Sequence, residues 1–113
     1  MFWVIYMNDV IYSIDEIQRI VAPIATKYDV DRVFLFGSYA RGNASSNSDL
    51  DFVIDKGRLR GLQLAGMLGD LQERFDKGVD LLTLTGISNG NVDGLPSFKQ
   101  GIEEDMVVVY EQQ

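Results

Sequence analysis

Two aspartates one residue apart, Asp49 and Asp51, open an apolar run in this 113-residue sequence. Side chains alternate between the two faces of a β-strand, so both carboxylates are predicted to point to one side, while Leu50 and Phe52 enter the core. Two carboxylates held this close repel each other and have raised pKa values unless a cation lies between them. Hard carboxylate oxygens suit Mg²⁺ or Mn²⁺, so this pair is a candidate site for a divalent metal ion.

A third aspartate, Asp80, lies in the apolar run 79–84, where a charge is unusual. If this run is a strand beside the strand of Asp49 and Asp51, three carboxylates converge. Three convergent carboxylates are typical of a two-metal site for transfer at phosphorus. One metal ion would lower the pKa of the attacking hydroxyl, and the other would stabilise the charge that leaves on pyrophosphate.

A Gly-Ser pair, Gly37 and Ser38, comes immediately after another apolar run. Glycine lets the backbone approach a ligand closely. The N–H groups of this turn and the Ser38 hydroxyl could then hold phosphate oxygens, especially if a helix starts there. Arg41 would add a fixed positive charge against a triphosphate.

The composition excludes several other chemistries. The chain has no Cys and no His, which removes disulfides, thiol nucleophiles, Cys/His zinc sites and a Ser-His-Asp triad. Its formal net charge is −7 and it has no Lys/Arg cluster, so we expect no direct binding to nucleic acid. The apolar residues 1–7 (MFWVIYM) are far fewer than the roughly 20 that span a bilayer, so they predict a strand or a docking tail. Cytoplasmic residence, with no membrane contact, is the default expectation.

The elements that must position these residues follow from the hydrophobic pattern. The length predicts a single domain over residues 1–113. Ser13 and Glu16 fit a capping box at the start of a helix over about 14–28, which contains Pro23. A second helix is expected over 59–75. Its predicted apolar face consists of Leu62, Ala65, Leu68, Leu71 and Phe75.

Short runs rich in β-branched and aromatic residues predict the strands. They cover residues 30–36, 50–54, 79–84 and 106–110. The remaining elements are a polar loop over 43–48, a Gly/Asn loop over 86–95 and a short helix around 96–104. This order predicts an α/β (α+β) fold, in which helices pack on a small mixed β-sheet.

The spacing of the polar residues resembles a known signature. Gly37-Ser38, ten residues, and then Asp49-Leu50-Asp51 is similar to the G-S-x10-D-x-D pattern of the DNA polymerase β-like nucleotidyltransferase superfamily. The fuller pattern, GSYARG followed by SDLD, resembles the minimal nucleotidyltransferases of bacteria and archaea. This resemblance is strong over 30–55 and fair over 78–84, and the closing FKQGIEEDMVVVYE also resembles the end of the family.

The resemblance implies a polymerase β-like fold and a function. Many minimal nucleotidyltransferases are antitoxins, paired with a HEPN-domain toxin that is an RNase. The implied reaction is the transfer of AMP from ATP to a tyrosine of that toxin, which silences it. The resemblance assigns Gly37 and Ser38 to the nucleotide phosphates, and Asp49 and Asp51 to Mg²⁺ or Mn²⁺. It makes Asp80 the third carboxylate and a candidate general base, and it implies a triphosphate contact for Arg41.

Several alternatives stay open on the sequence alone. Asp49 suits a turn after Ser48, Asp80 could pair with Lys77, and Arg41 could be an exposed loop charge. The same fold could also serve as a non-catalytic module that neutralises a partner by binding it, or as a small-molecule adenylyltransferase that works as a homodimer. The oligomeric state, the acceptor, the number of AMP units added and the base preference are not fixed by the residues.

Overall fold

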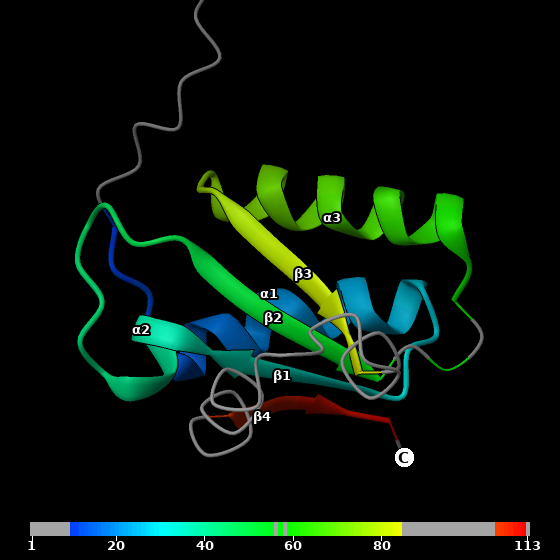
Figure 1. Ribbon diagram of the computed structural model, residues 1–113, viewed down its shortest axis with the longest axis horizontal. Coiled ribbons are helices and arrows are strands. Elements are labelled where there is room, and N and C mark those ends of the chain that lie inside the picture. Colours follow the sequence, from blue (N-terminus) through cyan, green and yellow to red (C-terminus); the bar gives the residue numbers. More distant parts are fainter. Residues whose placement is uncertain (1–9, 56, 58, 85–105, 113) are drawn as a thin grey trace, which may run out of the picture.

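Seven helices and strands make up the part of the chain described by the computed structural model, which covers residues 10–55, 57, 59–84 and 106–112 (Figure 1). In chain order they are α1 (Ile14–Lys27), β1 (Arg32–Phe36), α2 (Gly37–Arg41), β2 (Leu50–Asp55), α3 (Gly61–Phe75), β3 (Val79–Thr83) and β4 (Val107–Glu111). The predicted loop at 86–95, the predicted helix at 96–104 and the apolar residues 1–7 lie outside the described residues.

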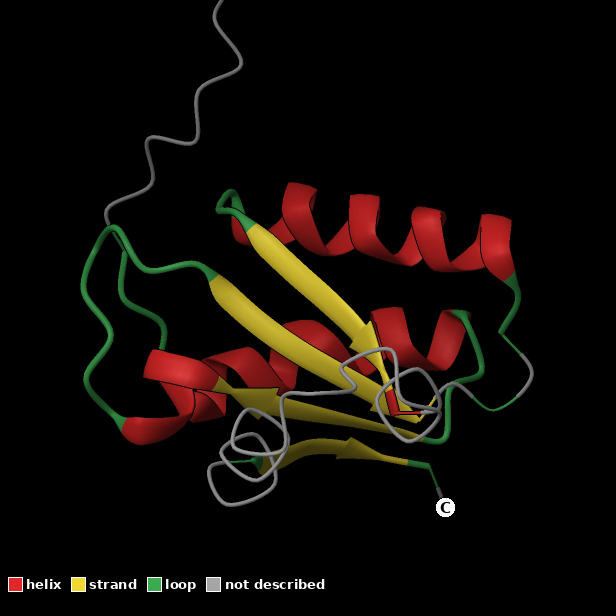
Figure 2. Cartoon of the chain, viewed as in Figure 1, coloured by secondary structure: helices red, strands yellow, loops and turns green. Residues whose placement is uncertain are grey.

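The four strands form one mixed sheet in the order β3-β2-β1-β4 (Figure 2). β1 is antiparallel to both β2 and β4, with a register shift between Val33 and Phe34 in its pairing with β4. β2 and β3 are parallel and are joined through α3. The predicted small mixed sheet with packed helices is therefore confirmed.

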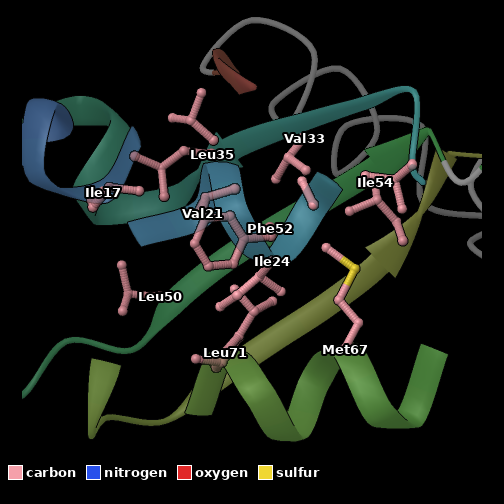
Figure 3. Close-up of a cluster of buried hydrophobic side chains, with 14 of the residues drawn as sticks. Ile17, Val21, Ile24, Val33, Leu35, Leu50, Phe52, Ile54, Met67 and Leu71 are labelled. Carbon is pink, nitrogen blue, oxygen red and sulfur yellow. The ribbon is translucent and has the colours of Figure 1, made fainter. Parts of the chain in front are cut away.

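The core lies between the sheet and the two long helices (Figure 3). The inward side chains of β2 are fully buried, as alternation along the strand predicted. They are Leu50, Phe52 and Ile54. α1 contributes Ile17, Val21 and Ile24, and α3 contributes Met67, Leu71 and Phe75. The opposite face of β2 carries Asp51 and Asp55, with Val53 between them buried in a smaller apolar cluster.

The start of α1 is capped as the sequence predicted. Glu16 N donates to Ser13 Oγ at 3.1 Å, and Ser13 N donates to Glu16 Oε1 at 2.9 Å. This reciprocal pair satisfies two N–H groups that the first helical turn leaves without partners. Pro23 lies inside the helix, which nevertheless continues to Lys27.

The predicted apolar face of α3 was wrong at its beginning. Leu62 is 92% exposed, and Ala65 is also exposed. A helix turns by about 100° per residue, so Leu62, nine residues before the buried Leu71, lies on the opposite side. The side chains that face the core are Leu64, Met67, Leu68, Leu71 and Phe75.

Two other differences concern the surroundings of β1. This strand begins at Arg32 rather than at residue 30, although Val30 is buried. The short helix α2 was foreseen only as a turn in which a helix could start, and it follows β1 without an intervening residue.

Within the described residues, no helix is long and apolar enough to cross a membrane.

Candidate active site

The predicted aspartates meet at one end of the sheet. Asp49 immediately precedes β2, and Asp51 is its second residue. In the parallel pairing of β2 with β3, Asp51 lies directly beside Asp80. The bond from Leu50 N to Gly78 O, at 3.0 Å, begins this pairing. The structure therefore brings together the two strands whose adjacency the three-carboxylate hypothesis required.

The charges of these residues act on one another. The pKa of Asp51 is raised to about 6, first by burial, then by a hydrogen bond with Asp80 and by the charges of Asp80 and Asp49. Arg41 has the opposite and smaller effect on the same pKa. A carboxyl that is half-buried beside two like charges is costly to ionise, and such groups are common at functional sites.

Glycine backbone borders two of the carboxylates. A Cβ on Gly37 would lie 2.5 Å from Asp51 Oδ2, and a Cβ on Gly78 would lie 2.5 Å from Asp49 Oδ1. Gly37 also has a φ of +74°, a left-handed conformation that side-chain-bearing residues rarely adopt. The missing side chain of Gly37 therefore makes room for the Asp51 carboxylate, whereas the sequence led us to expect that it makes room for a ligand.

The remaining predicted residues lie in α2, at the same end of the sheet as the beginnings of β2 and β3 (Figure 1). Ser38 is half-buried, in the first turn of α2. Arg41 is exposed in the last turn, and its charge reaches Asp51. Gly37 thus borders the Asp51 carboxylate, and the charges of Arg41, Asp49 and Asp80 all act on the pKa of Asp51, with Ser38 in the helix that begins beside it.

The donor chemistry of this site suits a divalent cation. Carboxylate oxygens are hard ligands, and the Asp51–Asp80 pair has an excess of negative charge that a cation would relieve. Among the described residues, no group of three acidic side chains is close enough together to form a metal cluster by itself. Mg²⁺ in proteins is often held by only one or two carboxylates, with water and substrate phosphates as its other ligands. The aspartates fit that type of site.

Two residues that the sequence analysis did not assign to the site also lie here. Gly78 contacts Asp49, and Lys77 reaches the loop before it, where its Nζ donates to Ser46 O at 2.8 Å. The signal for Gly78 was its place directly before the strand of Asp80. Nothing in the sequence pairs Lys77 with Ser46, because that contact depends on the path of the loop.

The comparison with protein families decides the identity of the domain. Residues 17–109 match the family described as nucleotidyltransferase domain. The chain belongs to this family. Two relatives of this nucleotidyltransferase come from Methanocaldococcus jannaschii and bear the provisional name protein adenylyltransferase. MJ0435 is 38% identical over 76 residues, which are 66% of this chain and 82% of the relative. MJ0126 is 37% identical over 87 residues, which are 74% and 80% of the two chains.

Solved structures agree with this nucleotidyltransferase in fold. A toxin–antitoxin structure with AMP-PNP gives a TM-score of 0.64 at 19% identity, over 85% of this chain and 74% of that chain. A mutant of the toxin–antitoxin MntA–HpeT gives 0.61 at 16% identity, over the same shares. Identities this low show the fold alone. The resemblance to nucleotidyltransferases predicted from Gly37-Ser38 and Asp49-Leu50-Asp51 is confirmed at the level of family, fold and enzyme class.

Proposed function

We propose that this nucleotidyltransferase transfers AMP from ATP to a tyrosine hydroxyl of a HEPN-type toxin and thereby acts as its antitoxin. The observation that carries the proposal is the position of Asp51 beside Asp80, with the Gly37 backbone against Asp51. The relatives named protein adenylyltransferase support a protein as the acceptor. The toxin–antitoxin complexes of similar fold support a toxin as that protein, and the one solved with AMP-PNP supports ATP as the donor.

The proposed reaction is a displacement at the α-phosphorus of ATP. The acceptor oxygen forms a bond to this phosphorus, the bond to the β-phosphate oxygen breaks, and pyrophosphate leaves with the electron pair. Asp80, which is exposed on β3, is suited to accept the proton of the acceptor hydroxyl. The Gly37-Ser38 backbone and the Ser38 hydroxyl would hold phosphate oxygens, and Arg41 would offset the charge of the triphosphate.

Mg²⁺ or Mn²⁺ would be held by Asp51 and Asp80, with Asp49 as a further carboxylate. When bound, the metal ion would supply positive charge to the phosphates and to the acceptor oxygen. Asp51 and Asp80 lie directly beside each other on neighbouring strands, which supports the proposal that one cation could bind to both.

The test is transfer of label from α-labelled ATP, in the presence of Mg²⁺, to the product of the neighbouring gene. We expect label on the partner with the wild-type chain and none when Asp49→Ala and Asp51→Ala are combined. Phosphotyrosine-type linkage of the AMP, established by mass spectrometry, would identify the acceptor residue.

Two other results would replace this function. Neutralisation of the partner that survives the double substitution would mean that binding, rather than transfer, is the function. Label that appears on small hydroxyl compounds, and never on the partner, would mean a small-molecule adenylyltransferase.

A further inference from the structure

Lys77 is buried although it is charged, with only 4% of its surface exposed. Burying an ammonium group is costly unless it is hydrogen-bonded. Its Nζ donates to the backbone carbonyl of Ser46 at 2.8 Å, and these residues are 31 positions apart in the chain. The bond therefore joins the residues that lead into β3 to the loop that leads into β2.

Ser46 is part of a tight turn. Ser48 N donates to Ser45 O at 3.0 Å, and Ser45 N donates to Ser48 Oγ at 2.9 Å. The Ser46 carbonyl held by Lys77 lies between these two closures. Asp49 follows the turn directly, so the position of the turn fixes where the Asp49 backbone enters the site.

Gly78 contacts Asp49 from the β3 side. Leu50 N donates to Gly78 O at 3.0 Å, which fixes the backbone next to Asp49. A Cβ on Gly78 would lie 2.5 Å from Asp49 Oδ1 and 3.0 Å from Asp49 Cγ. Real Cβ atoms do not approach this closely, so the present position of the carboxylate requires glycine at 78.

We propose that Lys77 and Gly78 are positioning residues for Asp49. Lys77 fixes the turn before Asp49, and Gly78 leaves the space that its carboxylate occupies near Asp51 and Asp80. Neither residue belongs to the Gly-Ser or the Asp-Leu-Asp pattern. The inference rests on the proposed function, because it matters only if Asp49 takes part in holding the metal ion.

The first test uses Gly78→Ala and a matched control, Gly69→Ala. Gly78 does not have a positive φ, so its backbone accepts alanine, and the exposed Asp49 carboxylate can turn away at small cost. Gly69 lies in α3 with nothing within 4 Å of its Cβ position. Binding of Mn²⁺ is measured from the electron paramagnetic resonance signal of the free ion, with a non-hydrolysable ATP analogue present. We expect about tenfold weaker binding in Gly78→Ala, the size typical of a lost supporting contact, and no change in Gly69→Ala.

The second test uses Lys77→Met, with Lys27→Met as its control. Methionine keeps the buried stem of Lys77 and removes only the ammonium group. Lys27 is exposed and pairs with Asp70 at 2.9 Å, on the packed helices α1 and α3. We expect Mn²⁺ binding about tenfold weaker in Lys77→Met, partial recovery in Lys77→Arg, and wild-type binding in Lys27→Met.

Thermal unfolding of each variant separates positioning from loss of the fold. Gly78→Ala is expected to unfold at nearly the wild-type temperature, so it remains informative even if Lys77→Met does not fold. Wild-type Mn²⁺ binding in both Gly78→Ala and Lys77→Met would overturn the inference and leave the proposed function standing. If the wild-type chain itself binds no Mn²⁺ with the analogue, both the proposed metal site and this inference fail.

Discussion

Two aspartates on the same face of β2, Asp51 and Asp55, lie in opposite electrostatic surroundings. Residues four apart in a strand share a face, so only their neighbours differ. Asp55 Oδ2 accepts a hydrogen bond from Arg32 Nη2 at 2.7 Å. Asp51 faces Asp80 instead and has its pKa raised to about 6.

The Asp55 carboxylate therefore stabilises the fold, whereas the ionised Asp51 carboxylate lowers the stability of the fold. The Arg32–Asp55 pair neutralises itself and closes one end of the β1–β2 pairing. The Asp51–Asp80 pair concentrates like charge at the other end, next to backbone that a glycine keeps open. Natural sequences tolerate such local conflicts mainly at functional sites.

The largest expected effect comes from replacing the two aspartates one at a time by asparagine. Asp51→Asn should lower AMP transfer by about a thousandfold, because a metal-ion contribution of several kcal/mol depends on this carboxylate. Asp55→Asn should leave transfer within about threefold of wild type, since its partner Arg32 serves the fold and a surface pair contributes little. Steady-state rates of label transfer measure both. Equal losses in the two variants would remove the distinction between the two ends of β2.

A smaller effect separates Gly37 from Gly42, two glycines with similar left-handed backbone. Their φ angles are +74° and +80°, so alanine at either position costs about 1 kcal/mol of unfolding free energy from backbone strain. Only at Gly37 would the new Cβ meet a carboxylate, since nothing lies within 4 Å at Gly42. We expect Gly37→Ala to lose most of its transfer activity and Gly42→Ala to keep it. Denaturant unfolding together with activity distinguishes strain from displacement of Asp51.

The pH dependence of stability should reveal the cost of Asp51 directly. Its pKa is higher in the folded chain, about 6, than the ordinary value of 3.8, so the folded state favours the protonated form. The loss of folding stability caused by ionised Asp51 is therefore absent below about pH 4. It grows as the pH rises to about 6 and is constant above that pH. Because the group is only half-buried, we expect Asp51→Asn to be more stable than wild type by only about 1 kcal/mol at pH 8, and equal to it at pH 4.

Denaturant unfolding of both chains at several pH values, without divalent ions, checks this prediction. Addition of Mg²⁺ and an ATP analogue at pH 8 should stabilise the wild type and leave Asp51→Asn unchanged. A stability difference that grows toward acidic pH would contradict the assigned sign.

We expect the Arg32–Asp55 ion pair to contribute modestly to the stability of the fold. Replacing Asp55 by asparagine removes the ion pair with Arg32, whose side chains are 30% and 40% exposed. Exposed pairs contribute about 0.5 kcal/mol, and high salt should reduce the effect. A double-mutant cycle with Arg32→Met isolates the pairwise part. A coupling energy several times larger would contradict the view that Arg32 and Asp55 form an ordinary solvent-exposed ion pair.

The smallest expected effect concerns Tyr39 of α2. Its hydroxyl is buried and has no hydrogen-bond partner within the described part of the chain, and burial raises its pKa. The backbone of Tyr12 lies near enough to influence the same pKa. Tyr39→Phe should therefore leave the stability unchanged or raise it by a few tenths of a kcal/mol, at most about 0.3 kcal/mol, because a poorly bonded buried hydroxyl is removed. Thermal unfolding measures the shift, and a clear loss of stability would mean that the contact with Tyr12 is a full hydrogen bond.

Most of the sheet and the two long helices were predictable because their signals are local. Ser13 and Glu16 begin α1 through contacts three residues apart, and the alternation in Leu50–Asp55 determines which side chains of β2 are buried. The buried face of α3 was harder to predict, because residues spaced three apart do not stay on one side of a helix with 3.6 residues per turn. Leu62 was therefore assigned to the wrong face.

The candidate site was predictable in its residues and only partly in its geometry. The pattern Gly37-Ser38 and Asp49-Leu50-Asp51 identified the family without structural information. That Asp80 lies beside Asp51 follows from the pairing of β2 with β3, and no local sequence pattern specifies this pairing. The bond from Lys77 to Ser46 and the contact of Gly78 with Asp49 depend on how a loop crosses the sheet end, so only the folded chain reveals them.

Binding of a divalent metal ion by Asp51 and Asp80 is tested most directly by a crystal of this chain grown with Mn²⁺ and a non-hydrolysable ATP analogue. We expect an anomalous Mn²⁺ peak in contact with the carboxylates of Asp51 and Asp80 and with the phosphates of the analogue near Gly37. An analogue bound elsewhere, or bound with no Mn²⁺ at these aspartates, would contradict this expectation.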